Sequence, residues 1–195
     1  KHNIPIPSAG VSMPEPTILT IDLNFMKKPG TIGVYLIPHN QGALLVESGP
    51  MSTLPELIDG LKLHGFTPSR ITDVFLTHIH LDHAGAAGWW AHQGARVHVH
   101  PAGASHLINP ERLLSSAARV YGSQMEAMWG SFSSVPDTQI HIMQDNSLIN
   151  VGGFPIRALE VPGHAIHHLA YLINDACFTG DVGGVRVHNQ NFITL

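Results

Sequence analysis

The chain has little of several features that mark whole classes of protein. It has one cysteine, Cys177, so no internal disulfide can form and the fold does not depend on oxidising conditions. Charged residues make up 12% of the sequence, about half the proportion in an average soluble domain. With 10 basic and 14 acidic side chains and no basic cluster, the sequence lacks the electrostatic footprint of a nucleic-acid-binding protein.

Long apolar runs are also missing. The sequence has no stretch of about 18 consecutive apolar residues and no apolar core of a signal peptide near its first residue, so we expect neither a membrane span nor a secretory leader. These absences favour a cytoplasmic protein that acts on a small-molecule substrate. The thinly charged surface is compatible with a homo-oligomer.

The order of the predicted elements defines the fold class. Residues 1–16, with four prolines, are expected to form an irregular N-terminal arm, and residues 17–195 a single domain. Strands and helices alternate along this domain, which is typical of a layered α/β fold. The expected strands cover 17–23, 33–37, 43–47, 71–76, 95–99, 139–143, 148–151, 154–160, 169–173 and 176–179. The expected helices cover 53–64, 84–92 and a segment that begins at Asn109-Pro110.

Some side chains have expected structural roles. Thr53 followed by Glu56 matches a capping box at the start of a helix. Cys177 lies in an apolar strand and is expected to pack there. After Asn109, five residues recur on one helical face and are expected to pack in the core: Leu114, Ala117, Tyr121, Met125 and Met128.

The most informative stretch is HIHLDH, residues 78–83, which directly follows the apolar strand 71–76. His78 and His80 are two residues apart, so in an extended segment both can face one ion, and imidazole nitrogens bind zinc at about 2.0–2.1 Å. Asp82 and His83 follow on a tight turn. Because one ion rarely takes four ligands from one short segment, the stretch predicts two metal ions, or one ion with supporting residues around it.

Two later segments supply further candidate ligands. His164 in VPGHAIHH and Asp181 in FTGD each follow a strand and stand beside a glycine. Open α/β sheets place ligand sites at strand ends, so we expect the three segments to converge. A three-histidine site with one open position, the pattern of catalytic zinc, would then form from His78, His80 and His164. The expected ligands of a second ion are Asp82, His83 and, as a bridge between the ions, Asp181.

These motifs together resemble the metallo-β-lactamase superfamily. The likeness covers about residues 17–186 and consists of His-x-His-x-Asp-His at 78–83, Pro-Gly-His at 162–164 and Gly-Asp at 180–181. It implies a four-layer αβ/βα sandwich with a two-metal site along one sheet edge, and the same assignment of ligands. It also implies that His168, which matches the second histidine of the GHTxGH run in glyoxalase II-like members, hydrogen-bonds beside the site without binding the ion.

Three departures from the family pattern stand out. Glu47-Ser48-Gly49 occupies the place where many members have Asp-Thr-Gly after an early strand, and His167 replaces the glycine of GHTxGH. The last metal-binding histidine of the family comes from a later strand, whereas the histidine that follows Asp181 here, His188, comes too soon. The resemblance therefore implies a sandwich that is incomplete at its C-terminus.

The predicted site indicates a zinc-dependent hydrolase with two zinc ions per chain, although iron or manganese suits the same ligands. A metal ion lowers the pKa of bound water to about 7, so hydroxide can attack a carbonyl carbon at neutral pH. Asp82, which can orient water or move a proton, and the bridging Asp181 are the catalytic candidates. The expected substrate is a thioester, ester, lactone or lactam, and the glyoxalase-like run favours the first two.

Two other functions stay open. Some members of the superfamily with the same ligands hold a single iron and oxygenate persulfides, and a fragment without the last ligand could bind metal without turnover. One further residue also has two interpretations. Asp73, on the strand that precedes His78, either buttresses a ligand ring or is an ordinary aspartate near the start of a strand.

Overall fold

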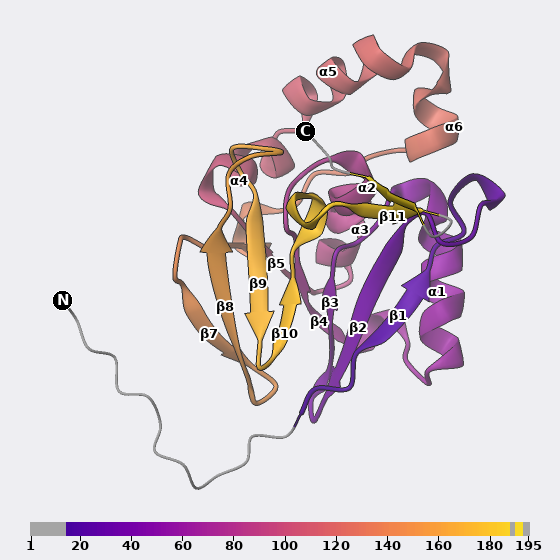
Figure 1. Ribbon diagram of the computed structural model, residues 1–195. Coiled ribbons are helices and arrows are strands. Elements are labelled where there is room, and N and C mark those ends of the chain that lie inside the picture. Colours follow the sequence, from indigo (N-terminus) through magenta and orange to yellow (C-terminus); the bar gives the residue numbers. More distant parts are fainter. Residues whose placement is uncertain (1–14, 188–189, 193–195) are drawn as a thin grey trace, which may run out of the picture.

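Two sheets packed face to face form the body of the molecule (Figure 1). The structure is a computed structural model that describes residues 15–187 and 190–192. The larger sheet, sheet A, has the strand order β1-β2-β3-β4-β5-β6 and the smaller, sheet B, the order β10-β9-β8-β7. Sheet A consists of β1 (Leu19–Asp22), β2 (Gly33–His39), β3 (Gly42–Val46), β4 (Ile71–Phe75), β5 (Arg96–Val99) and β6 (Ile140–Ile142). Sheet B consists of β7 (Leu148–Val151), β8 (Phe154–Glu160), β9 (Leu169–Ile173) and β10 (Ala176–Phe178).

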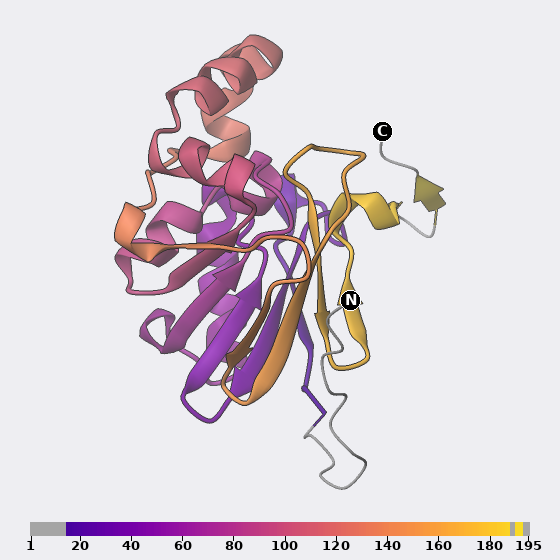
Figure 2. The same cartoon turned by 90° about the vertical axis from the view of Figure 1, so that its left-hand side faces the viewer.

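In the part of the chain that the structure describes, the helices lie on the outer side of sheet A or project beyond it (Figure 2). They are α1 (Leu54–Leu63), α2 (Leu81–Ala84), α3 (Ala87–His92), α4 (Pro101–Ile108), α5 (Glu111–Tyr121) and α6 (Met125–Trp129). A separate hairpin pairs β11 (Val185–Val187) with β12 (Gln190–Phe192). Among the described residues no helix is both long and apolar enough to cross a membrane. Helices, sheet A and sheet B are thus three of the layers that the predicted sandwich contains.

Sheet A is antiparallel at one edge and parallel in the middle. β1, β2 and β3 pair antiparallel, whereas β3, β4, β5 and β6 pair in parallel. All five residues of β3 are buried, as expected for a strand covered on both faces. Because β3 and β4 run in the same direction, the segments that follow them meet at one edge of the sheet.

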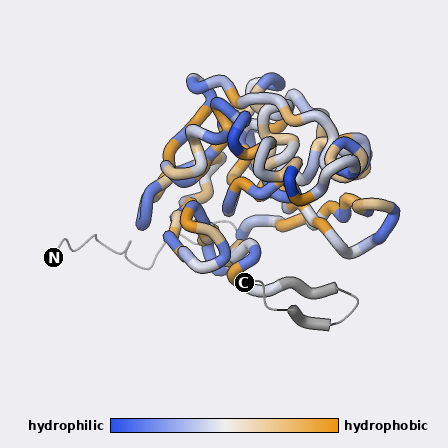
Figure 3. Tube along the Cα trace, turned by 90° about the horizontal axis from the view of Figure 1, so that it is seen from above, coloured by the Kyte–Doolittle hydropathy of each residue, from blue (hydrophilic) through white to orange (hydrophobic). Residues whose placement is uncertain are grey.

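Two apolar cores hold the layers together. One lies between the helices and sheet A and includes Leu57 and Trp90, and the other lies between the sheets and includes Phe75, Ile156 and Tyr171. Burying one large apolar side chain contributes about 1.5–3 kcal/mol, so each core is a substantial source of stability. Seen from above, the hydrophilic stretches lie mostly at the outer bends of the chain (Figure 3).

The predicted α/β class is confirmed, and most predicted elements are found within two residues of their expected bounds. The helix expected over 84–92 begins three residues later, as α3, and the separate short helix α2 before it and α4 after it were not predicted. The capping box is wrong, because Oγ1 of Thr53 donates to the carbonyl oxygen of Pro50 at 3.0 Å and makes no cap hydrogen bond. Cys177 is exposed on β10, so its expected packing role is wrong as well. Most of the predicted arm at 1–16, and His188, lie outside the described residues.

The helices α5 and α6 project from the body beyond α4 (Figures 1 and 2). None of the residues of α5 is buried. The predicted apolar face is interrupted, because α5 ends at Tyr121 and Gly122 (φ 52°) separates it from α6, which carries Met125 and Met128. All five residues of that face are only half-buried: Leu114, Ala117, Tyr121, Met125 and Met128. Their expected core packing is wrong because α5 lies against α4 and α6 and not on a sheet. At the end of α6, Trp129 is buried and stacks on Phe25, with 5.4 Å between ring centroids.

Candidate metal centre

The segment that follows β4 carries HIHLDH to the edge of sheet A and is tied there to sheet B. The backbone N–H of Leu169 donates to the carbonyl oxygen of Thr77 at 2.7 Å. The hydroxyl of Tyr171 donates to the carbonyl oxygen of Leu76 at 3.0 Å. Both donors belong to β9. These bonds fix the start of β9, and with it the preceding loop 161–168, beside the histidines of sheet A.

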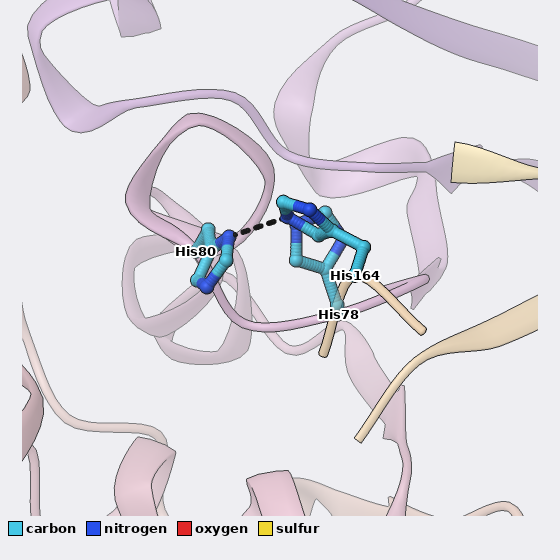
Figure 4. A group of neighbouring side chains, drawn as sticks. All are labelled: His78, His80 and His164. Carbon is cyan, nitrogen blue, oxygen red and sulfur yellow. Dashed lines mark hydrogen bonds between the residues drawn. The ribbon is translucent and has the colours of Figure 1, made fainter. Parts of the chain in front are cut away.

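Three predicted ligands meet at this edge. Nε2 of His164 lies 2.9 Å from Nδ1 of His80 (Figure 4). The ring centroid of His78 lies 4.7 Å from that of His80 and 5.0 Å from that of His164. Ligand atoms of all three residues fall within 4.8 Å of one another, a spacing that could hold one metal ion. The structure therefore brings together histidines that are separated by 84 positions in the sequence.

A second group shares a member with the first. Ligand atoms of His78, His83 and Asp181 also lie within 4.8 Å of one another. Nε2 of His83 is 3.2 Å from Oδ1 of Asp181, whose Oδ2 is 3.4 Å from Nε2 of His164. Asp181 thus stands between the two groups, where a bridging ligand would stand. Asp82 belongs to neither group, although its Oδ2 lies 3.5 Å from Nε2 of His83.

The donor atoms fit a metal ion with imidazole ligands. Nε2 of His78 is buried and has no hydrogen-bond partner among the described residues. Leaving such a group unsatisfied costs about 1–3 kcal/mol, a cost that coordination of an ion would remove. Two nitrogens at 2.0–2.1 Å from a tetrahedral zinc ion are about 3.3 Å apart, and those of His80 and His164 are already close to that separation.

The electrostatics also favour coordination. Burial lowers the pKa of His78 and of His80 below the usual value, and neighbouring imidazoles lower both further. Both rings are therefore neutral near pH 7 and keep a lone pair for an ion. Burial by itself would lower the pKa of His83, but the charge of Glu47 and hydrogen bonds to Asp181 raise it well above the usual value. In the absence of metal, His83 and Asp181 therefore form an ion pair.

Sequence reasoning missed two residues behind the site, Glu47 and Thr77. Both are buried, and Oγ1 of Thr77 donates to Oε1 of Glu47 at 2.6 Å. Glu47 follows β3 with a left-handed backbone (φ 70°), and the N–H and Oγ of Ser48 both donate to the carbonyl oxygen of His83 at 2.8 Å. The departure from Asp-Thr-Gly at this turn was the available signal for Glu47. Thr77 had none beyond its position next to His78.

The rings of His168 and His167 both lie near the ligand rings. His168 is buried and stacks on His78, with 4.7 Å between ring centroids. Its predicted hydrogen bond is not present among the described residues, where neither ring nitrogen has a partner. Gly180 closes over it, because a Cβ there would lie 2.8 Å from Nε2 of His168. The ring of His167 lies 6.0 Å from that of His80, and burial, followed by the charge of His80, lowers its pKa to about 4.

Asp73 contacts groups away from the site. Its carboxylate pairs with Arg96 at 2.9 Å and with Nε2 of His98 at 2.7 Å. Burial would raise the pKa of Asp73, but the hydrogen bonds from His98 and Arg96 outweigh it and lower the pKa to about 2. Asp73 therefore belongs to a polar network between the sheets and does not buttress a ligand ring.

A groove opens beside the second group of ligands. It has a volume of about 710 Å³ and lies between the free edge of sheet B and the strands β1 and β2. One end is polar and formed by Glu47, Asp82, His83 and Asp181. The lining also includes the rings of Tyr35 and Phe178, which pack edge to face with 5.1 Å between centroids. Its size is in the range of small-molecule sites.

Comparison with known proteins agrees with this fold. The chain matches the family model of the metallo-beta-lactamase superfamily over residues 28–189, and it belongs to that superfamily. It is 29% identical over 144 residues to the hydroxyacylglutathione hydrolase of Shewanella oneidensis. This alignment covers 72% of this chain and 43% of that protein. It is also 29% identical over 160 residues to the atrochrysone carboxyl ACP thioesterase of Aspergillus fumigatus, with 80% and 41% covered.

Solved structures show the same fold. A metallo-beta-lactamase superfamily protein from Sulfolobus tokodaii superposes with a TM-score of 0.70 at 23% identity, over 93% of this chain and 69% of that one. The chain spans less than half the length of the curated relatives it matches. The activity of a whole protein of this family is therefore a proposal for this chain.

Proposed function

We propose that the chain carries the metal centre of a hydrolase that acts on a carbonyl substrate, with zinc as the metal. The observation that carries the proposal is the convergence of three histidines from two sheets around the buried, unpartnered Nε2 of His78. Asp181, 3.4 Å from His164, supports a second ion and a bridging role. A bound divalent metal supplies Lewis acidity, which activates water and polarises a carbonyl group.

The side chains of the site would hold the metal ions and transfer a proton. His78, His80 and His164 would hold one ion, and His83 and Asp181 a second. Asp82 is half-buried at the polar end of the groove, where its carboxylate can orient a water molecule and take its proton. Proton transfer by a positioned side chain contributes about 10²–10⁴-fold, so Asp82→Asn should lower the rate by that factor.

A thioester or ester is the substrate class that we favour. Two curated relatives bear names of thioester-cleaving enzymes, a hydroxyacylglutathione hydrolase and an acyl carrier protein thioesterase. The groove supports a small acyl substrate, because its lining combines the candidate ligands His83 and Asp181 with the aromatic rings of Tyr35 and Phe178. A macromolecular substrate is not needed to explain any feature of the site.

The test is a hydrolysis assay on the purified chain loaded with zinc. We expect release of free thiol from an acyl-glutathione thioester, its loss with chelator, and its loss in His164→Ala. The exposed His64, at the end of α1, provides the matched control His64→Ala, which should retain activity. Stoichiometric iron with oxygen uptake would instead indicate an oxygenase, and bound zinc without turnover of thioesters, esters or lactones would indicate a metal-binding fragment. Either result contradicts the proposal.

A further inference from the structure

One carboxylate stands behind two of the candidate ligands. Oγ1 of Thr77 lies 2.6 Å from Oε1 of Glu47 and 3.1 Å from Nδ1 of His78. The N–H of Thr77 donates to Oε2 of the same glutamate at 3.4 Å. Nδ1 of His83 lies 3.3 Å from Oε1, although the two atoms are not aligned for a hydrogen bond. Glu47, Thr77 and His78 thus form a continuous chain of polar contacts that ends at the metal centre.

The donor and acceptor roles in the contacts between Glu47, Thr77 and His78 follow from the number of protons available. Glu47 accepts two hydrogen bonds from Thr77, from the hydroxyl at Oε1 and from the backbone N–H at Oε2. A hydroxyl has one proton to give. The proton of Thr77 is therefore committed to Glu47, and the oxygen of Thr77 is left to accept from His78.

The consequence reaches the metal centre. A neutral imidazole carries one proton, on Nδ1 or on Nε2. If Nδ1 of His78 donates to Thr77, Nε2 carries the lone pair, and Nε2 is the buried atom that has no partner among the described residues. The opposite tautomer would place two lone pairs against each other at the 3.1 Å contact and a proton where the ion must bind.

The position of the Thr77 hydroxyl is itself restricted. Gly180 packs against it, because a Cβ at that residue would lie 2.5 Å from Oγ1 of Thr77. The backbone at Gly180 is left-handed (φ 51°), which favours glycine there. The loop that carries Asp181 therefore closes over the hydroxyl and leaves it little room for another rotamer.

We propose that Glu47, acting through the hydroxyl of Thr77, is a positioning residue that fixes His78 in the Nδ1–H tautomer and thereby presents Nε2 to the metal. The inference rests on the proposed metal centre, but the tautomer is a property of the metal-free chain. It can therefore be measured without any assay of hydrolysis.

The primary test is long-range ¹H–¹⁵N NMR of the metal-free chain labelled at histidine, with the His78 signals identified by their loss in His78→Gln. We expect His78 to carry its proton on Nδ1. A proton on Nε2 overturns the proposal. Because this measurement uses the unmodified chain, it does not depend on whether any other variant folds.

Variants at Thr77 supply the second test. Thr77→Val removes the hydroxyl at nearly constant volume, so it should mix the two His78 tautomers and weaken zinc binding by about 10–100-fold, the usual effect of a residue that orients a metal ligand. Thr77→Ser keeps the hydroxyl and should retain both properties. Thr53→Val is a matched control, since it removes a buried hydroxyl that bonds to Pro50 instead of to an imidazole.

The outcomes separate the two proposals. A folded Thr77→Val chain with the original tautomer and zinc affinity, or a Thr77→Ser chain that loses both, overturns the positioning role. If His78 has the expected tautomer and responds to Thr77 as described, while the zinc-loaded chain hydrolyses nothing, the positioning role stands and the proposed hydrolase function fails.

Discussion

Single side chains set both the affinity for metal and the response to pH. His164 comes from the loop between β8 and β9, whereas His78 and His80 follow β4. Nε2 of His164 contacts Nδ1 of His80 at 2.9 Å and Oδ2 of Asp181 at 3.4 Å. His164 therefore belongs to the first group of candidate ligands and also contacts Asp181 of the second.

His164→Ala should lower the affinity for zinc by more than about 100-fold, because loss of a ligand exceeds the 10–100-fold effect expected for a residue that only orients one. Competition with a chromophoric chelator measures this change. The control His64→Ala alters an exposed residue and should leave the affinity unchanged. Equal affinities of the unmodified chain and His164→Ala would exclude His164 as a ligand.

His98 should make the fold sensitive to acid. It is buried between the sheets, with Nε2 on Asp73 and its ring stacked on Phe75, and Nδ1 has no partner among the described residues. Burial lowers its pKa below 6.5, although Asp73 partly opposes the shift. The unfolded chain therefore binds this proton at a higher pH than the folded chain does. The contribution of His98 to the free energy of unfolding should be constant above about pH 6.5 and should fall as the pH drops from there toward the folded pKa of His98.

Urea unfolding between pH 5 and 8 tests this expectation. One such group contributes at most about 1.4 kcal/mol per pH unit, and His98→Gln should remove that part of the slope. The other histidines still titrate in the variant, so the quantity to compare is the difference between the two profiles. Parallel profiles would show that His98 takes up no proton on unfolding in this range.

At the scale of elements, close backbone approach decides where the helices sit. Gly88 in α3 lies against the loop 131–136, and a Cβ there would be only 2.0 Å from the carbonyl oxygen of Ser133. Gly88→Ala should therefore lower the free energy of unfolding by roughly 1–3 kcal/mol, the usual cost of overpacking. At Gly163 a Cβ meets no atom within 4 Å, so Gly163→Ala is the control in the same denaturation experiment. Equal stability of the two variants would mean that α3 shifts freely.

Much of the element order could be predicted from the sequence because local patterns determine it. Strands such as β7 and β8 are bounded by turn residues and were predicted at their observed positions. The five apolar residues after Asn109 show the limit of such patterns. Their helical period holds only as far as Tyr121, where α5 ends. A period also cannot say whether a sheet lies beneath the helix, and α5 lies against α4 and α6 instead.

The candidate site also has residues that the sequence could predict and residues that it could not. His78, His80, His164 and Asp181 could be predicted because their residue types and wide spacing match a known pattern, and the structure brings them together. The role of Thr77 could not be predicted, since a threonine beside a histidine has no distinctive chemistry in sequence. Its partner Glu47 comes from another strand, and only the parallel pairing of β3 and β4 places them together.

At the scale of the whole molecule, metal binding should stabilise the fold. The site forms only when both sheets are in place, so an ion binds the folded chain in preference to the unfolded one. Free zinc at 100 times its dissociation constant should add about 2.7 kcal/mol to the free energy of unfolding. Thermal denaturation with zinc and with chelator measures the shift, and His164→Ala should reduce it. A melting temperature independent of zinc would contradict a site shared by the two sheets.

Tyr171 and Leu169 fasten the smaller sheet to the larger one through hydrogen bonds at the base of the histidine segment. An ion held by residues from both sides would link the two sheets at the same place. Separation of the two sheets would therefore release the ion. The fraction of chains with metal bound would thus report the fraction in which the two sheets are packed together.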